Sequence, residues 1–329
     1  MKILVRLPNW LGDMVMSIGF INALRQVYPN AQIDVIAKKG IDTLLDFFPE
    51  IANRYVFSKS EYPGLAGAYR FGKSIRQTTK ADLYFSLPDS FSTAVTGLGS
   101  GAAKRIGYRK ELRSILLTNA YNRPENIHRV DEYIHLLQKF SEKDIKVQPI
   151  RLTIPSRNPS GGLLINVNSE ASSRRLPVEK AASLVQDVLD QFPQHTISML
   201  GGPSDTAHVN DVINLLTPGH QINNLCGKTS IATLIQTMTD AALVITTDSG
   251  PAHLANATGT PVIVLFGAGN ENNTAPYNKE NLEIIRMGKL PCEPCRNNVC
   301  KIYGNPKCLQ DIDNGFVIDA VSRWLIHSR

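Results

Sequence analysis

The sequence of 329 residues contains no apolar run long enough to cross a lipid bilayer. Its first residues, MKILVRL, have neither a long apolar core nor a small-residue cleavage site, so they are typical of a first strand and not of a secretory signal. Apolar residues make up 43% and charged residues 19%, as in ordinary soluble globular proteins. We therefore expect a cytoplasmic protein, and the length favours two domains.

The sequence also lacks a dinucleotide-binding fingerprint in the expected place. The turn after the first strand, residues 7–12, has no GxGxxG pattern. Gly97 and Gly99 follow a predicted helix instead, and no acidic residue stands about twenty positions further on. An NAD-dependent oxidoreductase is therefore disfavoured. Aromatic residues, only 7% of the chain, do not interleave with basic ones, so we do not expect a nucleic-acid partner.

Cysteine is scarce, and four of the five cysteines lie in one segment: Cys292, Cys295, Cys300 and Cys308. In a cytoplasmic protein such clustering favours a metal over a disulfide. The spacing is only partly zinc-like, because a single CxxC pair is followed by two widely separated cysteines. A structural metal, a disulfide and free thiols all remain open. We expect the four cysteines to stabilise a loop and to take no part in catalysis.

Positive charge predominates, with 35 Lys and Arg against 29 Asp and Glu and a net charge of +6. This balance favours an anionic partner, although it does not choose between nucleic acid, phosphorylated lipid and a membrane surface. A basic stretch at residues 104–113 suits a ligand with phosphates and carboxylates, and it also suits a merely solvated positive face.

Short apolar strands alternate with helices in both halves of the chain, which is typical of parallel doubly wound sheets. A proline-containing segment at 143–162 separates the two series, so we predict domains at residues 1–155 and 156–329. The predicted strands cover 2–7, 33–37, 55–57 and 82–87, then 163–167, 196–200, about 224, 243–245 and 262–266. The predicted helices cover 13–28, 42–47, 66–77, one from 89, 130–140, then 177–191, one from 205, 230–239, 251–258 and 318–327.

The turn at residues 248–250 connects the strand 243–245 to a helix that starts near Pro251. Open α/β sheets bind ligands at such carboxyl strand ends, where free N–H groups and a partial positive charge meet anions. The turn is therefore a candidate phosphate site. An N-terminal cap by Asp248 and a packing role for Gly250 explain the same residues without a ligand.

Two further turns carry candidate chemistry. Asp13, after Gly12 in the first strand–helix turn, is placed either as an N-terminal cap or as a general base for an acceptor hydroxyl. Residues 168–177 combine hydroxyls with Arg174 and Arg175 ahead of a helix, as a diphosphate leaving group requires. Solvated arginines are the alternative. Residues 201–203 and 227–230 occupy equivalent strand ends and are weak signals alone.

Five segments together resemble the ADP-heptose:lipopolysaccharide heptosyltransferases, glycosyltransferase family 9. They are PNWLGDM at 8–14, LPDSF at 87–91, KRIGY at 104–108, RRLP at 174–177 and TDSGPAH at 247–253. The second and third are more similar to type II members of the family than to type I. The resemblance covers nearly the whole chain.

The resemblance implies a GT-B fold: two doubly wound Rossmann-like domains facing across a cleft, the first binding the acceptor and the second the ADP-sugar. The resemblance also allows the final helix to pack against the first domain. The implied reaction is inverting transfer of L-glycero-D-manno-heptose from ADP-heptose to an anionic lipopolysaccharide core, without a cofactor or a catalytic metal. The implied location is cytoplasmic, in peripheral contact with the inner membrane.

By the same resemblance, Asp13 is the general base and Arg174 neutralises the leaving ADP. The expected donor-binding residues are Ser169, Arg175, Lys228, Thr229, Asp248, Ser249, Gly250 and His253. The expected acceptor-binding residues are Gly12, Lys104, Arg105 and Arg109. The alternative function is a non-catalytic nucleotide- or polyanion-binding protein of the same fold.

Overall fold

The computed structural model describes residues 1–154, 156, 158 and 161–327. The chain divides into two compact units, residues 1–153 and 154–329. The boundary expected at 155 and 156 falls partly on Pro155, which lies outside the described residues, as does Pro159 of the predicted linker. Within the described part, no helix is both long and apolar enough to cross a membrane.

The first unit is built on a six-stranded sheet with the order β3-β2-β1-β4-β5-β6, and all of its pairs are parallel. Val5 of the central strand pairs with Val35 on one side and Phe85 on the other, and all three side chains are buried. Leu4, which points to the opposite face from Val5, is also buried, so the sheet is covered on both faces, as parallel sheets are. The strands are β1 (Lys2–Arg6), β2 (Gln32–Lys38), β3 (Asn53–Phe57), β4 (Leu83–Ser86), β5 (Lys104–Tyr108) and β6 (Asn119–Tyr121).

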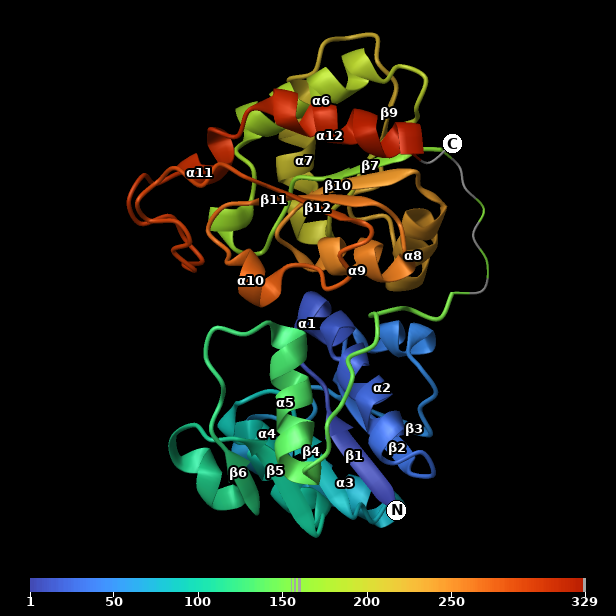
Figure 1. Cartoon of the computed structure of the whole chain (residues 1–329), viewed down its shortest axis with the longest axis vertical. Coiled ribbons are helices and arrows are strands. Elements are labelled where there is room, and N and C mark those ends of the chain that lie inside the picture. Colours follow the sequence, from blue (N-terminus) through green and yellow to red (C-terminus); the bar gives the residue numbers. More distant parts are fainter. Residues whose placement is uncertain (155, 157, 159–160, 328–329) are drawn as a thin grey trace. The chain divides into compact units, whose positions relative to one another are not determined.

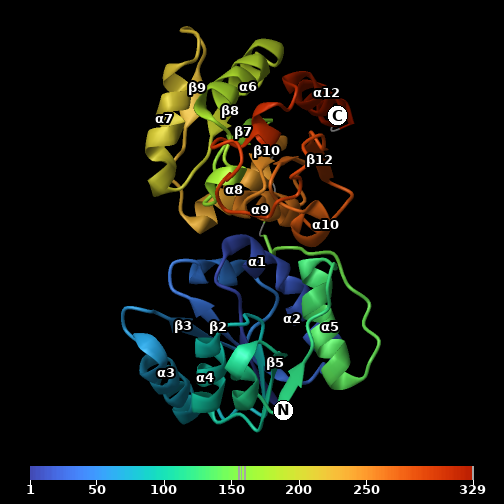
Figure 2. The ribbon, with the colours of Figure 1, turned by 90° about the vertical axis from the view of Figure 1, so that its left-hand side faces the viewer.

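Helices cover both faces of this sheet. The pair α2 and α5 pack together on one face, and α3 and α4 on the other (Figure 2). The α3–α4 contact is close, because a Cβ on Gly72 would lie 2.2 Å from the carbonyl oxygen of Thr96. The helices are α1 (Leu11–Met16), α2 (Ile18–Val27), α3 (Gly64–Thr78), α4 (Phe91–Ser100) and α5 (Arg129–Ser141), with 3₁₀ turns η1 (Asp42–Phe47) and η2 (Glu111–Leu116).

The helix predicted over 13–28 is two helices in the structure. It breaks at Ser17, whose hydroxyl donates to the carbonyl oxygen of Met14 at 2.6 Å. Side-chain bonds of this kind compete with the helical ladder and often bend it. The break leaves α1 as a short separate helix that carries Asp13.

The second unit repeats the plan, with a parallel sheet in the order β12-β11-β10-β7-β8-β9. Its central strand β10 is buried along its whole length. The strands are β7 (Leu163–Asn166), β8 (Ile197–Met199), β9 (Ile222–Asn224), β10 (Leu243–Thr247), β11 (Val262–Phe266) and β12 (Leu282–Arg286).

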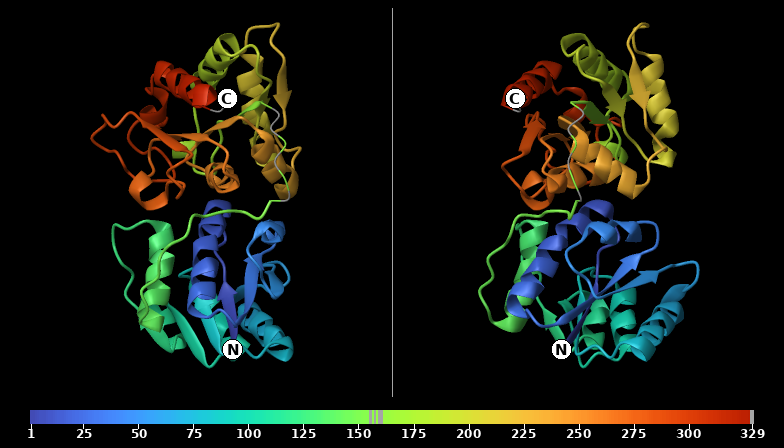
Figure 3. Two further views of the ribbon diagram at one scale, coloured as in Figure 1. Left: turned by 45° about the vertical axis from the view of Figure 1, so that its right-hand side comes forward. Right: turned by 90° about the vertical axis from the view of Figure 1, so that its right-hand side faces the viewer.

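Helices α6 and α12 lie on one face of the second sheet, and α8 and α9 lie on the other (Figures 1 and 3). The final helix, α12, contacts α6 and strands β10, β11 and β12 of its own unit. The helices are α6 (Val178–Gln191), α7 (Thr206–Asn214), α8 (Ile231–Asp240), α9 (Gly250–Thr258), α10 (Glu271–Thr274), α11 (Lys307–Gln310) and α12 (Asn314–His327), with turns η3 (Ser172–Arg174) and η4 (Pro203–Asp205).

Strands β5, β6 and β12 were not predicted. The stretch 97–113, interpreted only as basic and rich in glycine, contains the end of α4, all of β5 and the start of η2. Lys104 and Arg105 interrupt the apolar pattern that marks the other strands, and β6 has only three residues. Strand β12 lies at an edge and alternates less clearly, because most of its residues are only partly buried.

Candidate functional site

Each sheet has one topological switch point, where the chain leaves two neighbouring strands in opposite directions. In the first unit it lies between β1 and β4, and in the second between β7 and β10. Open α/β sheets bind ligands outside the carboxyl ends of strands at this point. The turns that carry Asp13, Arg174 and Asp248 follow these strands. The switch points are therefore the candidate positions for ligand-binding and catalytic residues.

Asp13 lies in the first turn of α1, after the carboxyl end of β1. Its Oδ1 lies 3.4 Å from Nε of Arg129 at the start of α5, and its side chain remains 26% exposed. The buried Arg6 supports the turn by donating hydrogen bonds to Asn9 Oδ1 and the carbonyl oxygen of Leu7. Burial lowers the pKa of Arg6 to about 10, so it stays charged at neutral pH. Asp13 thus has an accessible carboxylate on a fixed turn.

A chain of ion pairs extends from Arg129 along this edge. The buried carboxylate of Glu132 lies 2.7 Å from Arg129 Nη1 and 2.7 Å from Arg123 Nη2. Arg123 and Lys110 then meet Asp89, after β4, at 3.2 and 3.1 Å. Burial works against the charge of Asp89, but the hydrogen bond from Lys110 and the charge of Arg123 hold its pKa below the usual value. The switch point of the first unit is thus lined by alternating charges.

The expected acceptor residues divide between the two edges of the sheet. Gly12 adjoins Asp13, and Arg109 follows β5 at the carboxyl edge, where its Nε donates to the carbonyl oxygen of Ala120. Lys104 and Arg105 instead begin β5 and lie at the amino edge. Lys104 Nζ lies over the ring of Phe140, and Arg105 donates to backbone carbonyls. The structure brings Gly12 together with Asp13 and does not bring Lys104 or Arg105 there.

In the second unit, Asp248 and Ser249 form the turn between β10 and α9, and the helix starts at Gly250 with Pro251 in its first turn. The Ser249 hydroxyl donates to the carbonyl oxygen of Thr247 and does not cap the helix. The first amides of α9 are therefore not satisfied by this side chain. An uncapped helix start of this kind favours an anionic ligand.

Arg174 reaches this turn from η3. Its Nη1 lies 3.4 Å from Asp248 Oδ2, and its Nε is buried without a hydrogen-bond partner in the structure. The side chain of Asp248 is only 5% exposed, so this pair lies at the base of the corner. Gly269 is required beside it, because a Cβ there would lie 2.0 Å from Asp248 Oδ2. A partly exposed guanidinium whose buried Nε has an unused donor is well suited to a further oxygen ligand.

Buried amides and hydroxyls join the two turns of this corner. Asn166 Nδ2 donates to Ser249 Oγ at 3.1 Å and to the carbonyl oxygen of Asn168 at 3.1 Å. Thr247 Oγ1 donates to the same carbonyl oxygen at 2.7 Å, and Ser169 Oγ donates to the carbonyl oxygen of Asp248. Ser169, Asp248, Ser249 and Gly250 therefore form one connected corner.

The other expected donor residues lie around this corner with different partners. Arg175 pairs with Asp205 at 2.9 Å and so does not share the partner of Arg174. Lys228 and Thr229 follow β9 at the same carboxyl edge, and Lys228 is exposed. His253 is buried within α9, one turn beyond Ser249. Arg174 is thus the cation that the structure places against the Asp248 turn.

The cysteine cluster does not form a metal site in the structure. All five cysteines, which lie within the described part of the chain, are free thiols. Among the described residues, no group of three or more His, Cys, Asp or Glu side chains could hold a metal ion. A structural metal at Cys292, Cys295, Cys300 and Cys308 is therefore not supported, because the thiols are not arranged as a ligand set.

Comparison with known proteins identifies the family. The sequence pattern described as glycosyltransferase family 9 (heptosyltransferase) matches residues 68–304, more than half of the chain. The chain belongs to this family. This family 9 enzyme is 26% identical over 340 residues to lipooligosaccharide heptosyltransferase 2 of Campylobacter jejuni, with 100% of this chain and 99% of the relative covered. The expected likeness to heptosyltransferase II is confirmed.

Solved structures support the fold of this family 9 protein. The E. coli ADP-heptose lps heptosyltransferase II has a TM-score of 0.82 and 24% identity, with 99% of each chain covered. The family 9 glycosyltransferase from Veillonella parvula has a TM-score of 0.86 and 20% identity, with 99% and 97% covered. The predicted α/β class, a GT-B fold of two doubly wound domains, is confirmed.

Sequence reasoning missed the residues that surround Asp13 and Asp89. Arg129 pairs with Asp13 and Arg123 with Asp89, and Glu132 joins the two arginines. Of the three, only Glu132 falls within the helix predicted over 130–140. Glu132 and Arg129 at i and i+3 on one helix were an available signal. No sequence signal marked Gly269. Glycine is required there only because the Asp248 carboxylate occupies the space that a Cβ would fill.

Proposed function

We propose that this family 9 enzyme transfers L-glycero-D-manno-heptose from ADP-heptose to the inner core of lipopolysaccharide, with inversion and without a metal. The relatives carry heptosyltransferase names, and the name of the E. coli enzyme includes ADP-heptose. The observation that carries the proposal is Arg174, whose buried Nε has no partner beside the uncapped start of α9. A diphosphate supplies the oxygens that this corner lacks.

In the proposed reaction, Asp13 accepts the proton of an acceptor hydroxyl while that oxygen forms a bond to C1 of the heptose. The bond between C1 and the phosphate oxygen breaks, and ADP leaves with the electron pair. Arg174 and the first amides of α9 stabilise the negative charge that develops on the diphosphate. Because these groups are already oriented, a divalent cation is not needed, and turnover should survive an excess of EDTA.

Donor binding is assigned to the corner in the second unit. Ser249, Gly250 and Ser169 offer amides or a hydroxyl to the diphosphate, and Arg175, Lys228 and Thr229 lie on the same edge of the sheet. Asp248 and His253 contact the donor sugar or phosphate in this proposal. The second unit is therefore the proposed ADP-sugar domain, and the first is the proposed acceptor domain.

Acceptor binding is assigned to the carboxyl edge of the first sheet. Gly12 allows a close approach next to Asp13, and Arg109 adds positive charge at the end of β5. Lys104 and Arg105 were expected in this group, but they lie at the opposite edge of the sheet, so we leave them out of the proposed acceptor site. Arg123 and Arg129 replace them as the proposed contacts for an anionic core.

A lipid-linked acceptor also requires contact with the cytoplasmic face of the inner membrane. In the first unit, η2 exposes Leu112 and Ile115 by 69% and 78%, and Arg109 and Lys110 precede them. Apolar side chains next to cations are suited to an interface with anionic lipids. We assign the peripheral membrane contact to this turn.

The direct test is to mix purified protein with ADP-heptose and core acceptors of defined length and to weigh the products. A mass increase of one heptose, with release of ADP, is expected. The alternative is a non-catalytic nucleotide- or polyanion-binding protein. Asp13→Asn separates the two, because it should reduce turnover by roughly 10²- to 10⁴-fold while ADP still binds. Normal turnover in Asp13→Asn would exclude the proposed base.

A further inference from the structure

The segment that carries four cysteines, residues 287–306 and α11, has little regular structure of its own. Between β12 and α11 its backbone makes few hydrogen bonds, among them Glu293 N to the carbonyl oxygen of Leu290 and Arg296 N to that of Ala268. A long irregular segment inside a compact domain usually serves a function. We call residues 292–308 the cysteine loop.

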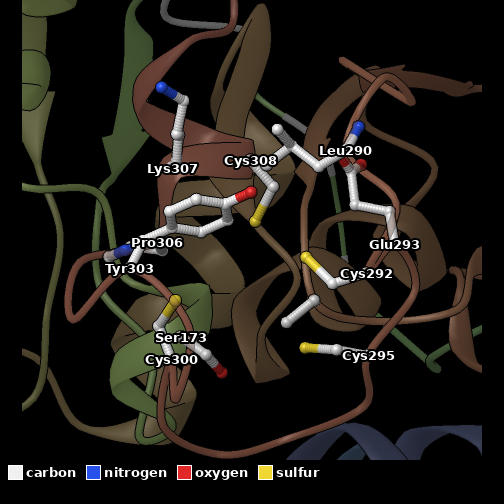
Figure 4. A pocket seen from close by; sticks show the side chains of 11 residues that line it. Ser173, Leu290, Cys292, Glu293, Cys295, Cys300, Tyr303, Pro306, Lys307 and Cys308 are labelled. Carbon is white, nitrogen blue, oxygen red and sulfur yellow. The ribbon is translucent and has the colours of Figure 1, made fainter.

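The cysteine loop folds around a small pocket. Cys292, Cys295, Cys300 and Cys308 all line it, and Figure 4 shows the sulfur atoms of Cys292 and Cys308 pointing towards each other. Burial raises the pKa of Cys308 to about 11, and Glu293 and the neighbouring thiols add to this. The Cys308 thiol is thus protonated at neutral pH and packs as a small apolar group.

Ser173 lies in η3, outside the cysteine loop. It connects this pocket to the corner formed by Arg174 and the Asp248 turn. It lines the same pocket and is 1% exposed. Its hydroxyl donates to the carbonyl oxygen of Asn297 at 2.5 Å, and its amide donates to that of Asn298 at 3.2 Å. Ser172 Oγ adds a weaker contact to Asn298 at 3.3 Å. The cysteine loop therefore supplies backbone acceptors to η3.

The turn η3 needs this support because it consists of three residues. Its last residue, Arg174, is tied locally by its amide to the carbonyl oxygen of Ala171 at 2.9 Å. The guanidinium reaches 3.4 Å from Asp248, and its Nε is buried without a partner. A small displacement of η3 would move this guanidinium away from the start of α9.

We infer that Ser173, held by the Asn297 and Asn298 carbonyls of the cysteine loop, is a positioning residue that aims Arg174 at the donor diphosphate. The inference rests on the proposed function, because it takes Arg174 to contact a nucleoside diphosphate. Ser173 acts only through Arg174 and does not touch the ligand. The four cysteines line the pocket that Ser173 also lines.

The test is a double-mutant cycle with ADP as the probe, measured by calorimetry under reducing conditions. Four full-length proteins are compared: wild type, Ser173→Ala, Arg174→Ala and the double variant. Ser173→Ala should weaken ADP binding roughly fivefold in the wild-type background, as for a lost buried hydrogen bond. In the Arg174→Ala background the same change should have less than about a twofold effect, because the positioned group is absent.

Ser172→Ala is the matched control, since it removes the neighbouring hydroxyl that is exposed and more weakly bonded. It should leave ADP affinity within about twofold. An equal loss from Ser173→Ala in both backgrounds would show a general structural role and would overturn the positioning role. The proposed function would survive that result. If Arg174→Ala leaves ADP binding unchanged, the donor role of Arg174 fails and the positioning role fails with it.

Ser173→Ala could unfold the second unit, and thermal melting of each variant detects this. In that case the cycle is repeated with Ser173→Cys, which is somewhat larger than serine and retains a weak S–H donor. A smaller coupling with Arg174 of the same sign is expected. A lack of coupling in this folded variant counts against the positioning role as firmly as it would for alanine.

Discussion

The two units share one fold but differ in charge. The first contains 22 Lys and Arg against 14 Asp and Glu, and the second contains 13 against 15, so the whole positive excess lies in the first. The candidate site of the first unit is accordingly a network of ion pairs around Asp13 and Asp89. That of the second unit is a corner of amides and hydroxyls with Arg174. Equivalent switch points in the two units thus offer an anion two different environments: a network of charged side chains in the first, and amides and hydroxyls with one arginine in the second.

The contrast explains why a single cation should matter more in the second unit. Where net charge is slightly negative, an anionic donor depends on local groups and not on the field of the whole domain. In the first unit several cations share the task, so the loss of one is partly compensated by its neighbours.

Replacing Arg174 with alanine should weaken ADP binding by roughly 10- to 100-fold, the range for hydrogen bonds to charged groups. It should also lower turnover, because the leaving diphosphate loses its counter-charge. Calorimetry with ADP and the product assay measure the two effects. Arg175→Ala is the control: its guanidinium pairs with Asp205, so a loss of less than about threefold is expected. Equal losses in both variants would mean that the corner has no single dominant cation.

In the first unit, Glu132→Gln should lower the free energy of unfolding by about 2 kcal/mol. The carboxylate is buried and accepts hydrogen bonds from Arg123 and Arg129 on its two oxygens, whereas the glutamine amide has one acceptor oxygen and no charge. Denaturant unfolding measures the loss. Glu125→Gln, at an exposed position, should change stability by less than about 0.5 kcal/mol. Equal stability of the two variants would show that the network around Asp13 is not a stabilising unit.

Gly269→Ala tests the packing of the second corner. A Cβ at this position would lie 2.0 Å from Asp248 Oδ2, so the carboxylate must move, and the pair with Arg174 moves with it. Overpacking of this kind costs about 1–3 kcal/mol, and we expect roughly tenfold weaker ADP binding. In Gly202→Ala the nearest atom is 3.6 Å away, so its affinity should not change. Wild-type ADP affinity in Gly269→Ala would contradict the tight packing around Asp248.

The sequence was sufficient for the fold and for the residues that follow central strands. Asp13, Arg174 and Asp248 were predicted because a turn between a strand and a helix can be recognised from local patterns alone. Lys104 and Arg105 show the limit. Their charge suggested a ligand, but which edge of the sheet they occupy depends on β5, a strand with a charged start that the pattern did not reveal.

The partners of these residues could not be predicted for a different reason. Arg129 meets Asp13 across more than one hundred positions of sequence, and Ser173 meets Asn297 across a similar distance. Such pairs depend on how helices and loops pack, and they cannot be predicted from the spacing of residues along the chain. The cysteine cluster had a visible spacing, yet the structure gives it free thiols around a pocket and not the metal that the spacing allowed.

The smallest expected effect concerns the membrane contact proposed for the first unit. Leu112→Ser together with Ile115→Ser should reduce binding to vesicles of phosphatidylglycerol and phosphatidylcholine by roughly fivefold, because two exposed apolar side chains no longer enter the interface. Cosedimentation measures the bound fraction, and added salt should weaken binding further because Arg109 and Lys110 contribute by charge. Val299→Ser with Ile302→Ser is the matched control, since these side chains are exposed by 57% and 65% in the second unit. If both double variants lose binding equally, exposure alone governs the contact, and the positive excess of the first unit has no part in choosing the surface.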